Sequence, residues 1–305
     1  MAILIPRQKI ELKDLVKSFD GLTRNELAYL GGWFDTDASF ESYPNTKYKT
    51  VTLSLALRDR GPVEHLSKIF RSSLRTRKTN PEMYKDKIGK IMYRTEVSGT
   101  SAVEFTNRVG HFVFNRTRER DALLALRNTY VKFDFLSMSD EEFIWWLTAC
   151  FEGDGSVKVN HSKKVYGVNI VNNNRAMLNY IVKRSKDFGI FWSGPYIAQK
   201  EEKNVSWNHG TDYTIDRETG YVISLDSVKA YEFCRLIYHR MTCDRKKVKV
   251  REICITFNLE NAYEIWKTKS NRKNFKFPKV LPTHRILHRT NTKRKSKNKR
   301  SEKRN

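Results

Sequence analysis

Apolar positions fall into two similar series along the chain, and each series starts with helical spacing. The residues that set this spacing are Leu27, Leu30, Gly31 and Phe34 in the first series and Phe143, Trp146, Leu147 and Cys150 in the second. A capping box precedes each run, with Thr23 and Glu26 in the first and Ser139 and Glu142 in the second. The pattern therefore predicts two helices with polar starts, and Asp140 is an alternative cap for the second.

Period-two alternation follows each helical run and predicts antiparallel strands. In residues 47–58 the apolar face is formed by Val51, Leu53, Leu55 and Leu57, and in residues 157–171 by Tyr166, Val168 and Ile170. Further helices are expected at 61–70, 101–109, 118–130, 175–187, 228–238 and 245–254, and further strands at 91–97, 192–200 and 221–225. Residues 75–81 form a basic loop in this prediction, and 201–219 an extended hairpin or loop. Each series thus runs helix, two strands, helix, two strands, helices.

Two short segments, residues 30–40 and 147–157, nearly repeat each other. Each combines an apolar run, small residues at its second and third positions, and an acid-x-Asp-small-Ser sequence. The final acids, Asp37 and Asp154, lie 117 positions apart. An internal duplication explains this spacing best, so one chain can build its own pseudo-dimer.

The small residues predict a close contact between the two helices. Each glycine inside a helix costs about 0.5–1 kcal/mol relative to alanine, so Gly31 and Gly32 need a reason to be adjacent there. We expect them to contact the other helix, where Thr148 and Ala149 stand at the corresponding positions.

That packing brings the two aspartates together. Asp37 and Asp154 are expected just past helix C-termini, where the helix dipole disfavours negative charge. Two carboxylates in one place need a cation, and a hard divalent ion with oxygen ligands, Mg²⁺ above all, meets that need. The alternative is that both turns are solvated helix ends.

Charge and cysteine content narrow the function. The 305 residues include 58 Lys and Arg against 34 Asp and Glu, a net charge of +24, which favours nucleic acid as the partner. No apolar run is long enough to span a membrane or to act as a secretory signal, so a soluble protein is expected. Four isolated cysteines indicate buried free thiols, and zinc or histidine-based nuclease motifs have little support.

Residues 30–38 and 147–155 resemble the motif of the LAGLIDADG homing endonucleases, with departures at Ala38, Thr148 and Ala149. The resemblance covers roughly residues 20 to 260. It implies an α+β fold of two tandem αββαββα repeats, with antiparallel sheets forming a DNA-binding saddle and the motif helices packed at a pseudo-twofold interface. Asp37 and Asp154 would then be catalytic and hold Mg²⁺ or Mn²⁺, together with the backbone carbonyls of Thr36 and Gly153.

The resemblance also assigns DNA contacts on the saddle. Groove-facing or phosphate-neutralising candidates are Tyr48, Thr50, Thr52, Ser54, Arg58, Arg75, Arg77, Lys78, Lys158, Asn160 and Asn169. Cations near the scissile phosphate are expected among Arg116, Arg118, Arg245 and Lys246. Solvated strand faces and helix starts are the alternatives for these residues.

The expected organisation is an N-terminal extension (1–20), a first repeat (21–131), a linker (132–138), a second repeat (139–258) and a basic, disordered C-terminal tail (259–305). Residues 290–305 contain eight Lys or Arg and one Glu, and no apolar residue. This tail fits a nucleic-acid arm, a solubilising tail or a nuclear-targeting run.

The expected function is site-specific double-strand DNA cleavage by a monomer at a long asymmetric site, encoded in an intron or by a free-standing gene, with an organelle as one candidate compartment. The competing hypothesis is an intron-RNA maturase on the same fold, alone or combined with cleavage. A DNA-binding regulator is a third alternative. Both aspartates favour cleavage, because a pure RNA binder does not need them.

Overall fold

The computed structural model describes residues 19–43, 50–57, 59–78, 91–126, 138–162, 165–200, 202–206 and 214–270. Predictions for Tyr48, Arg58, the N-terminal residues 1–18 and the tail beyond Ser270 lie outside the described residues. None of the helices in the described part of the chain is both long enough and apolar enough to cross a membrane.

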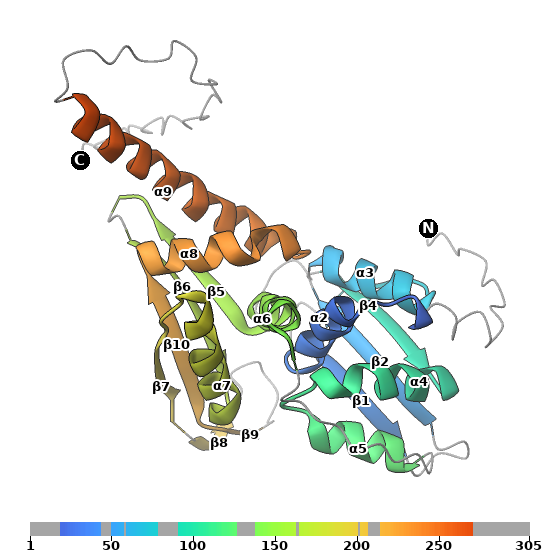
Figure 1. Ribbon diagram of the computed structural model, residues 1–305. Helices are drawn as coiled ribbons and strands as arrows, with labels where there is room; N and C mark the ends of the chain where they lie inside the picture. Colours follow the sequence, from blue (N-terminus) through green and yellow to red (C-terminus); the bar gives the residue numbers. More distant parts are fainter. Residues whose placement is uncertain are drawn as a thin grey trace, which may run out of the picture. The chain divides into compact units, whose positions relative to one another are not determined.

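The first repeat follows the predicted order of elements (Figure 1). Its elements are α2 (Arg24–Phe34), β1 (Ala38–Tyr43), β2 (Thr50–Leu57), α3 (Arg60–Phe70), β3 (Arg75–Lys78), β4 (Ile91–Ser98), α4 (Thr100–Val109), the 3-10 helix η2 (Gly110–Phe112) and α5 (Thr117–Leu126).

The second repeat has the same plan with one insertion. Its elements are α6 (Asp140–Asp154), β5 (Gly155–Asn160), β6 (Val165–Asn172), α7 (Arg175–Ser185), η4 (Lys186–Phe188), β7 (Ser193–Gln199), β8 (Glu202–Ser206), β9 (Thr214–Arg217), β10 (Gly220–Asp226), α8 (Val228–Ile237), η5 (Tyr238–Arg240) and α9 (Asp244–Ser270). The insertion forms the separate β8–β9 hairpin, one of the two expected alternatives.

The two sheets share one topology. Their strand orders are β1-β2-β4-β3 and β5-β6-β10-β7, and all neighbouring strands are antiparallel. In each sheet the strand that directly follows a motif aspartate is an edge strand, paired with the second strand of its repeat. This equivalence of topology confirms the two-repeat α+β fold.

Each repeat has its own core beneath its sheet. In the second repeat the predicted strand face of Tyr166, Val168 and Ile170 is buried, and its strand packs against α6 and α8. The first core also includes Ala149 of α6, and the second includes Ala28 of α2. The motif helices therefore contribute to both cores.

α2 and α6 lie side by side (Figure 1). A Cβ atom placed on Gly32 would overlap the carbonyl oxygen of Trp146 and lie 2.8 Å from the Cβ of Ala149, so the backbones approach closely there. The predicted contact of Gly31 with the other motif helix is wrong. A Cβ on Gly31 would instead meet the backbone of Phe112 in η2, because the next residue on a helix points about 100° away.

Thr148 is fully buried, and its hydroxyl donates to the carbonyl of Ile144 one turn earlier, at 2.7 Å. Both capping boxes form as predicted, and the second N-cap is Ser139, not Asp140. Asp154 is the last residue of α6, so the prediction that it lies just past the end of its helix is wrong. Asp37 follows the last residue of α2, Phe34, by three positions, as predicted.

Two predicted elements need correction. Residues 75–78 are the edge strand β3, not a loop, and pair with β4 from Arg75 opposite Arg94 to Lys78 opposite Ile91. The strand consists of Arg, Thr and Lys, so it shows no apolar alternation. Charged residues are typical of strands at sheet edges. α9 is also longer than expected and continues past Cys254 to Ser270.

Candidate active site at the ends of the motif helices

Asp37 and Asp154 meet where α2 and α6 end. A Cβ atom on Gly153 would lie 2.6 Å from the Cβ of Thr36 and 3.2 Å from Oδ2 of Asp37. The Asp37 carboxylate therefore lies against the residue that precedes Asp154. Only a glycine at position 153 allows this approach.

The two carboxylates influence each other's charge. Burial raises the pKa of Asp154 to about 6, and the negative charge of Asp37 adds to this shift. Desolvation by the surrounding protein also raises the pKa of Asp37, although part of this residue is exposed to solvent. The charges of Lys246 and Arg116 act on both aspartates in the opposite direction. These four side chains form one electrostatic unit.

The two cations occupy corresponding places. Nη2 of Arg116 donates to the carbonyl of Thr36 at 2.8 Å, and Nζ of Lys246 donates to the carbonyl of Gly153 at 2.7 Å. These are the carbonyls that precede Asp37 and Asp154. Each carbonyl oxygen has two lone pairs, so the hydrogen bond from the cation leaves one that could bind a metal ion. The role of these carbonyls as metal ligands stays a prediction.

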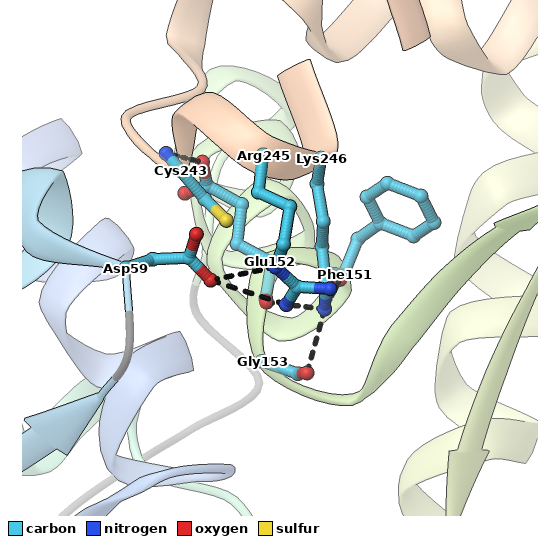
Figure 2. A network of polar contacts seen from close by, with 7 residues as sticks. All are labelled: Asp59, Phe151, Glu152, Gly153, Cys243, Arg245 and Lys246. Carbon is cyan, nitrogen blue, oxygen red and sulfur yellow. Dashed lines mark hydrogen bonds and ion pairs between the residues drawn. The ribbon is translucent and has the colours of Figure 1, made fainter. Parts of the chain in front are cut away.

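Lys246 is the more deeply buried cation. Its ammonium also donates to the carbonyls of Phe151, at 3.2 Å, and Glu152, and so covers the last turn of α6 (Figure 2). A positive charge is favourable at a helix C-terminus. Burial lowers the pKa of Lys246, while the nearby Cys243 and the two aspartates oppose that shift.

The other two expected cations point elsewhere. Arg118 is exposed on α5, and Arg245 forms an ion pair with Asp59 at 3.1 Å (Figure 2). Arg245 and Lys246 are consecutive residues of α9, so their side chains point about 100° apart, and Lys246 is the one that reaches the end of α6. Arg116 precedes α5, whereas Arg118 lies in its first turn. Of the four expected cations, Arg116 and Lys246 are the ones that lie beside the aspartates.

The first acid of each motif, Asp35 and Glu152, was not among the predicted site residues. Asp35 is 1% exposed and accepts hydrogen bonds from the backbone N–H groups of Phe114 (2.8 Å) and Asn115 (2.6 Å) and from the indole Nε1 of Trp146 (2.8 Å). Burial raises its pKa to about 7, against the effect of these hydrogen bonds.

Glu152 has the same arrangement in the second repeat. Its carboxylate accepts hydrogen bonds from the backbone N–H groups of Thr242 (2.6 Å) and Cys243 (2.5 Å) and from the hydroxyl of Tyr29. Burial raises its pKa to about 7 as well. The signal in the sequence was the recurrence of an acid two residues before each aspartate.

The two halves of the site are not identical. Nδ2 of Asn172 donates to Oδ2 of Asp154 at 2.6 Å. Counting back two residues from the helix N-caps Asn174 and Asp59, the corresponding position in the first repeat is Leu57, which has no polar side chain.

The described DNA-contact candidates lie on the sheets. Lys158 and Asn160 are exposed on one face of β5, and the half-buried Asn169 shares that face opposite Ser156. Arg75 is exposed at the sheet edge and pairs with Glu96 at 2.6 Å. The remaining candidates of the first repeat stand in β2 (Thr50, Thr52 and Ser54) and in β3 (Arg77 and Lys78).

All four cysteines are free thiols; Cys150, Cys234 and Cys243 are buried and Cys254 is half-buried. Within the described part of the chain, no three His, Cys, Asp or Glu side chains are grouped so as to hold a metal ion.

No protein-family model and no curated protein matches this chain. Among solved structures, the homing endonuclease I-WcaI bound to its DNA recognition sequence is 14% identical, with a TM-score of 0.46 over 81% of this chain and 94% of that chain. The meganuclease I-SmaMI bound to uncleaveable DNA is 12% identical, with a TM-score of 0.43 over 82% and 99%. I-DmoI in complex with DNA and Ca is 13% identical, with a TM-score of 0.40 over 70% and 90%. By these comparisons the chain is similar to solved homing endonucleases.

Proposed function

We propose that this protein is a monomeric, site-specific endodeoxyribonuclease that cuts both strands of a long asymmetric DNA site in a metal-dependent reaction. The observation that carries the proposal is the meeting of Asp37 and Asp154 from two repeats, each beside its own cation. Two half-centres in one chain suit two phosphodiester bonds. The net charge of +24 suits a polyanionic substrate.

The donor set fits a hard divalent cation. Asp37 and Asp154 offer carboxylate oxygens, and the carbonyls of Thr36 and Gly153 lie beside them. Mg²⁺ prefers oxygen ligands and commonly uses one or two carboxylates together with substrate phosphates. A bound Mg²⁺ or Mn²⁺ would supply Lewis acidity and neutralise charge that develops on the phosphate.

Three side chains beside the aspartates would favour binding of a phosphodiester. Arg116 and Lys246 place positive charge next to the aspartates, which favours the ionised carboxylates and attracts phosphate oxygens. Asn172 fixes the orientation of the Asp154 carboxylate. Because corresponding residues differ between the repeats, each repeat should bind a different half-site, so the full site is asymmetric.

The exposed strand face of Lys158 and Asn160 supports binding in the major groove, where amide and ammonium groups can contact base edges. Arg75, Arg77 and Lys78 at the edge of the first sheet would neutralise phosphates and so position the protein.

Selection from a plasmid library with a randomised insert tests the function. Wild-type protein with Mg²⁺ should linearise a subset of plasmids that share one site. With Ca²⁺ in place of Mg²⁺ it should bind the selected site without cutting. The Asp37→Asn, Asp154→Asn double variant should also bind without cutting, and continued linearisation by that variant would refute the assignment.

A further inference from the structure

We propose that Asp35 and Glu152 are positioning residues, which hold Arg116 and Lys246 beside the two catalytic aspartates. This inference rests on the proposed nuclease function and adds a role for two acids that do not reach the substrate. Each acid fixes the loop that leads to one cation.

The first clamp consists of Asp35 and the loop before α5. The carboxylate accepts hydrogen bonds from the consecutive N–H groups of Phe114 and Asn115, and Nδ2 of Asn115 donates back to the carbonyl of Asp35 at 3.2 Å. The next residue is Arg116, whose guanidinium reaches Thr36, the residue after Asp35. Both ends of this loop are thereby tied to the end of α2.

The second clamp repeats the geometry with different residues. Oε1 of Glu152 accepts both consecutive N–H groups, those of Thr242 and Cys243, just before α9. Figure 2 shows the contact with Cys243. Lys246 follows within the first turn of α9 and reaches the carbonyl of Gly153, the residue after Glu152. As in the first repeat, the acid binds the loop before the cation, and the cation binds the residue that follows the acid.

Burying the carboxylates of Asp35 and Glu152 costs free energy unless hydrogen bonds compensate for the lost hydration. Both carboxylates are nearly inaccessible to water, and a buried charge needs hydrogen-bond donors to compensate for its missing hydration. Each receives two backbone donors and one side-chain donor from the opposite motif helix: the indole of Trp146 for Asp35 and the hydroxyl of Tyr29 for Glu152. A carboxylate accepts such a set, whereas an amide would turn its own N–H₂ group towards donors.

The match between the repeats supports a role in positioning. Asp replaces Glu, Trp replaces Tyr and Arg replaces Lys, yet the same acid-to-loop-to-cation connection is present twice. The duplicated halves have changed the residues and kept the connection.

Strand-resolved cleavage of the selected plasmid site tests the inference. Asp35→Asn should slow cleavage of one strand by about 10–100-fold, the usual effect of removing a group that orients an active-site residue. Glu152→Gln should slow cleavage of the other strand. The two variants should therefore accumulate nicked plasmids with opposite strands cut, while Asp35→Glu and Glu152→Asp, which keep a carboxylate, should restore part of the rate.

Two core variants control for reduced stability. Leu66→Ala in α3 and Ile181→Ala in α7 remove buried side chains outside the clamps and should slow both strands to the same extent. If Asp35→Asn and Glu152→Gln also slow both strands equally, or slow neither, the positioning role is wrong.

Amide hydrogen exchange separates this inference from the proposed function. Asp35→Asn should speed exchange at Phe114 and Asn115, and Glu152→Gln at Thr242 and Cys243, each without effect on the other loop. Unchanged exchange at these amides overturns the clamps even if the wild-type protein is a nuclease. If the wild-type protein cuts no plasmid but the two variants show the paired exchange effects, the nuclease function is wrong and the clamps are supported.

Discussion

Gly32 and Ala149 stand at corresponding positions of the two motifs and face each other across the α2–α6 interface. A Cβ atom on Gly32 would lie 2.8 Å from that of Ala149 and would overlap the Trp146 carbonyl oxygen. This close approach brings the two helix ends together, and with them Asp37 and Asp154. The geometry of the candidate site therefore depends on a contact between two small residues.

Replacing Gly32 by leucine should destabilise the protein and abolish cleavage. A bulky side chain between two backbones forces the helices apart, and overpacking of this kind costs about 1–3 kcal/mol. Thermal melting and plasmid cleavage measure the two effects. Gly220→Ala is the matched control, because a Cβ there has no neighbour closer than 3.6 Å. Equal melting temperatures for Gly32→Leu and the control would contradict this packing.

A second contact between the repeats lies at the helix starts, where Arg24 of α2 pairs with Glu142 of α6. The Arg24 side chain is 63% exposed and that of Glu142 only 6%. Burial works to raise the pKa of Glu142, but hydrogen bonds from Arg24 and Ser139 outweigh it, so the net shift is downward.

Arg24→Ala should accordingly lower the free energy of unfolding by about 1 kcal/mol near neutral pH, since it leaves a buried carboxylate with fewer donors. The lowered pKa means that the ion pair stabilises the fold above the ordinary pKa of a glutamate, about 4.3, and that this stabilisation disappears as the pH falls through the lower folded-state value. Urea unfolding at pH 7 and pH 3 measures the difference. A gap between wild type and variant that persists undiminished at pH 3 would argue against this ion pair.

Asn172→Leu, which makes the second half resemble the first at this position, should slow cleavage of one strand. The substitution removes the amide that donates to Asp154, which we propose as a metal ligand, and removal of a group that orients a metal ligand typically costs about 10–100-fold in activity. Strand-resolved cleavage measures the effect. The exposed neighbour Asn173, changed to leucine, is the control. Equal rates for the two variants would remove Asn172 from the site.

The sequence predicted the duplicated plan and both motif helices because caps and apolar spacing are local signals. The predicted contact with the other motif helix is confirmed for Gly32 and wrong for Gly31, since spacing along one helix does not reveal which neighbour covers each face. β3 was missed because an edge strand of Arg and Thr carries no apolar alternation.

The candidate site was predicted only in part for a similar reason. Asp37 and Asp154 stood out through their repetition, whereas the partners of Asp35 and Glu152 are backbone N–H groups distant in sequence. Every residue type but proline carries such a group, so no residue type marks the loops at Asn115 and Cys243. Four cations near helix starts were equivalent in the sequence, and only the direction of each side chain separated Arg116 and Lys246 from the others.

Base recognition and general attraction to DNA should be separable in two variants. Lys158→Ala removes an exposed cation from the strand face proposed to contact bases, and a well-paired side chain there contributes about 1–3 kcal/mol of discrimination. Deleting residues 290–305 instead removes eight cations, so affinity should fall similarly for the selected site and for random duplexes. The slope of log affinity against log salt should flatten by about 0.9 for each phosphate that the shortened protein no longer neutralises. Competition titrations at several salt concentrations measure both effects. If the deletion erased preference for the selected site while Lys158→Ala weakened binding to both DNAs equally, the two surfaces would have the opposite roles.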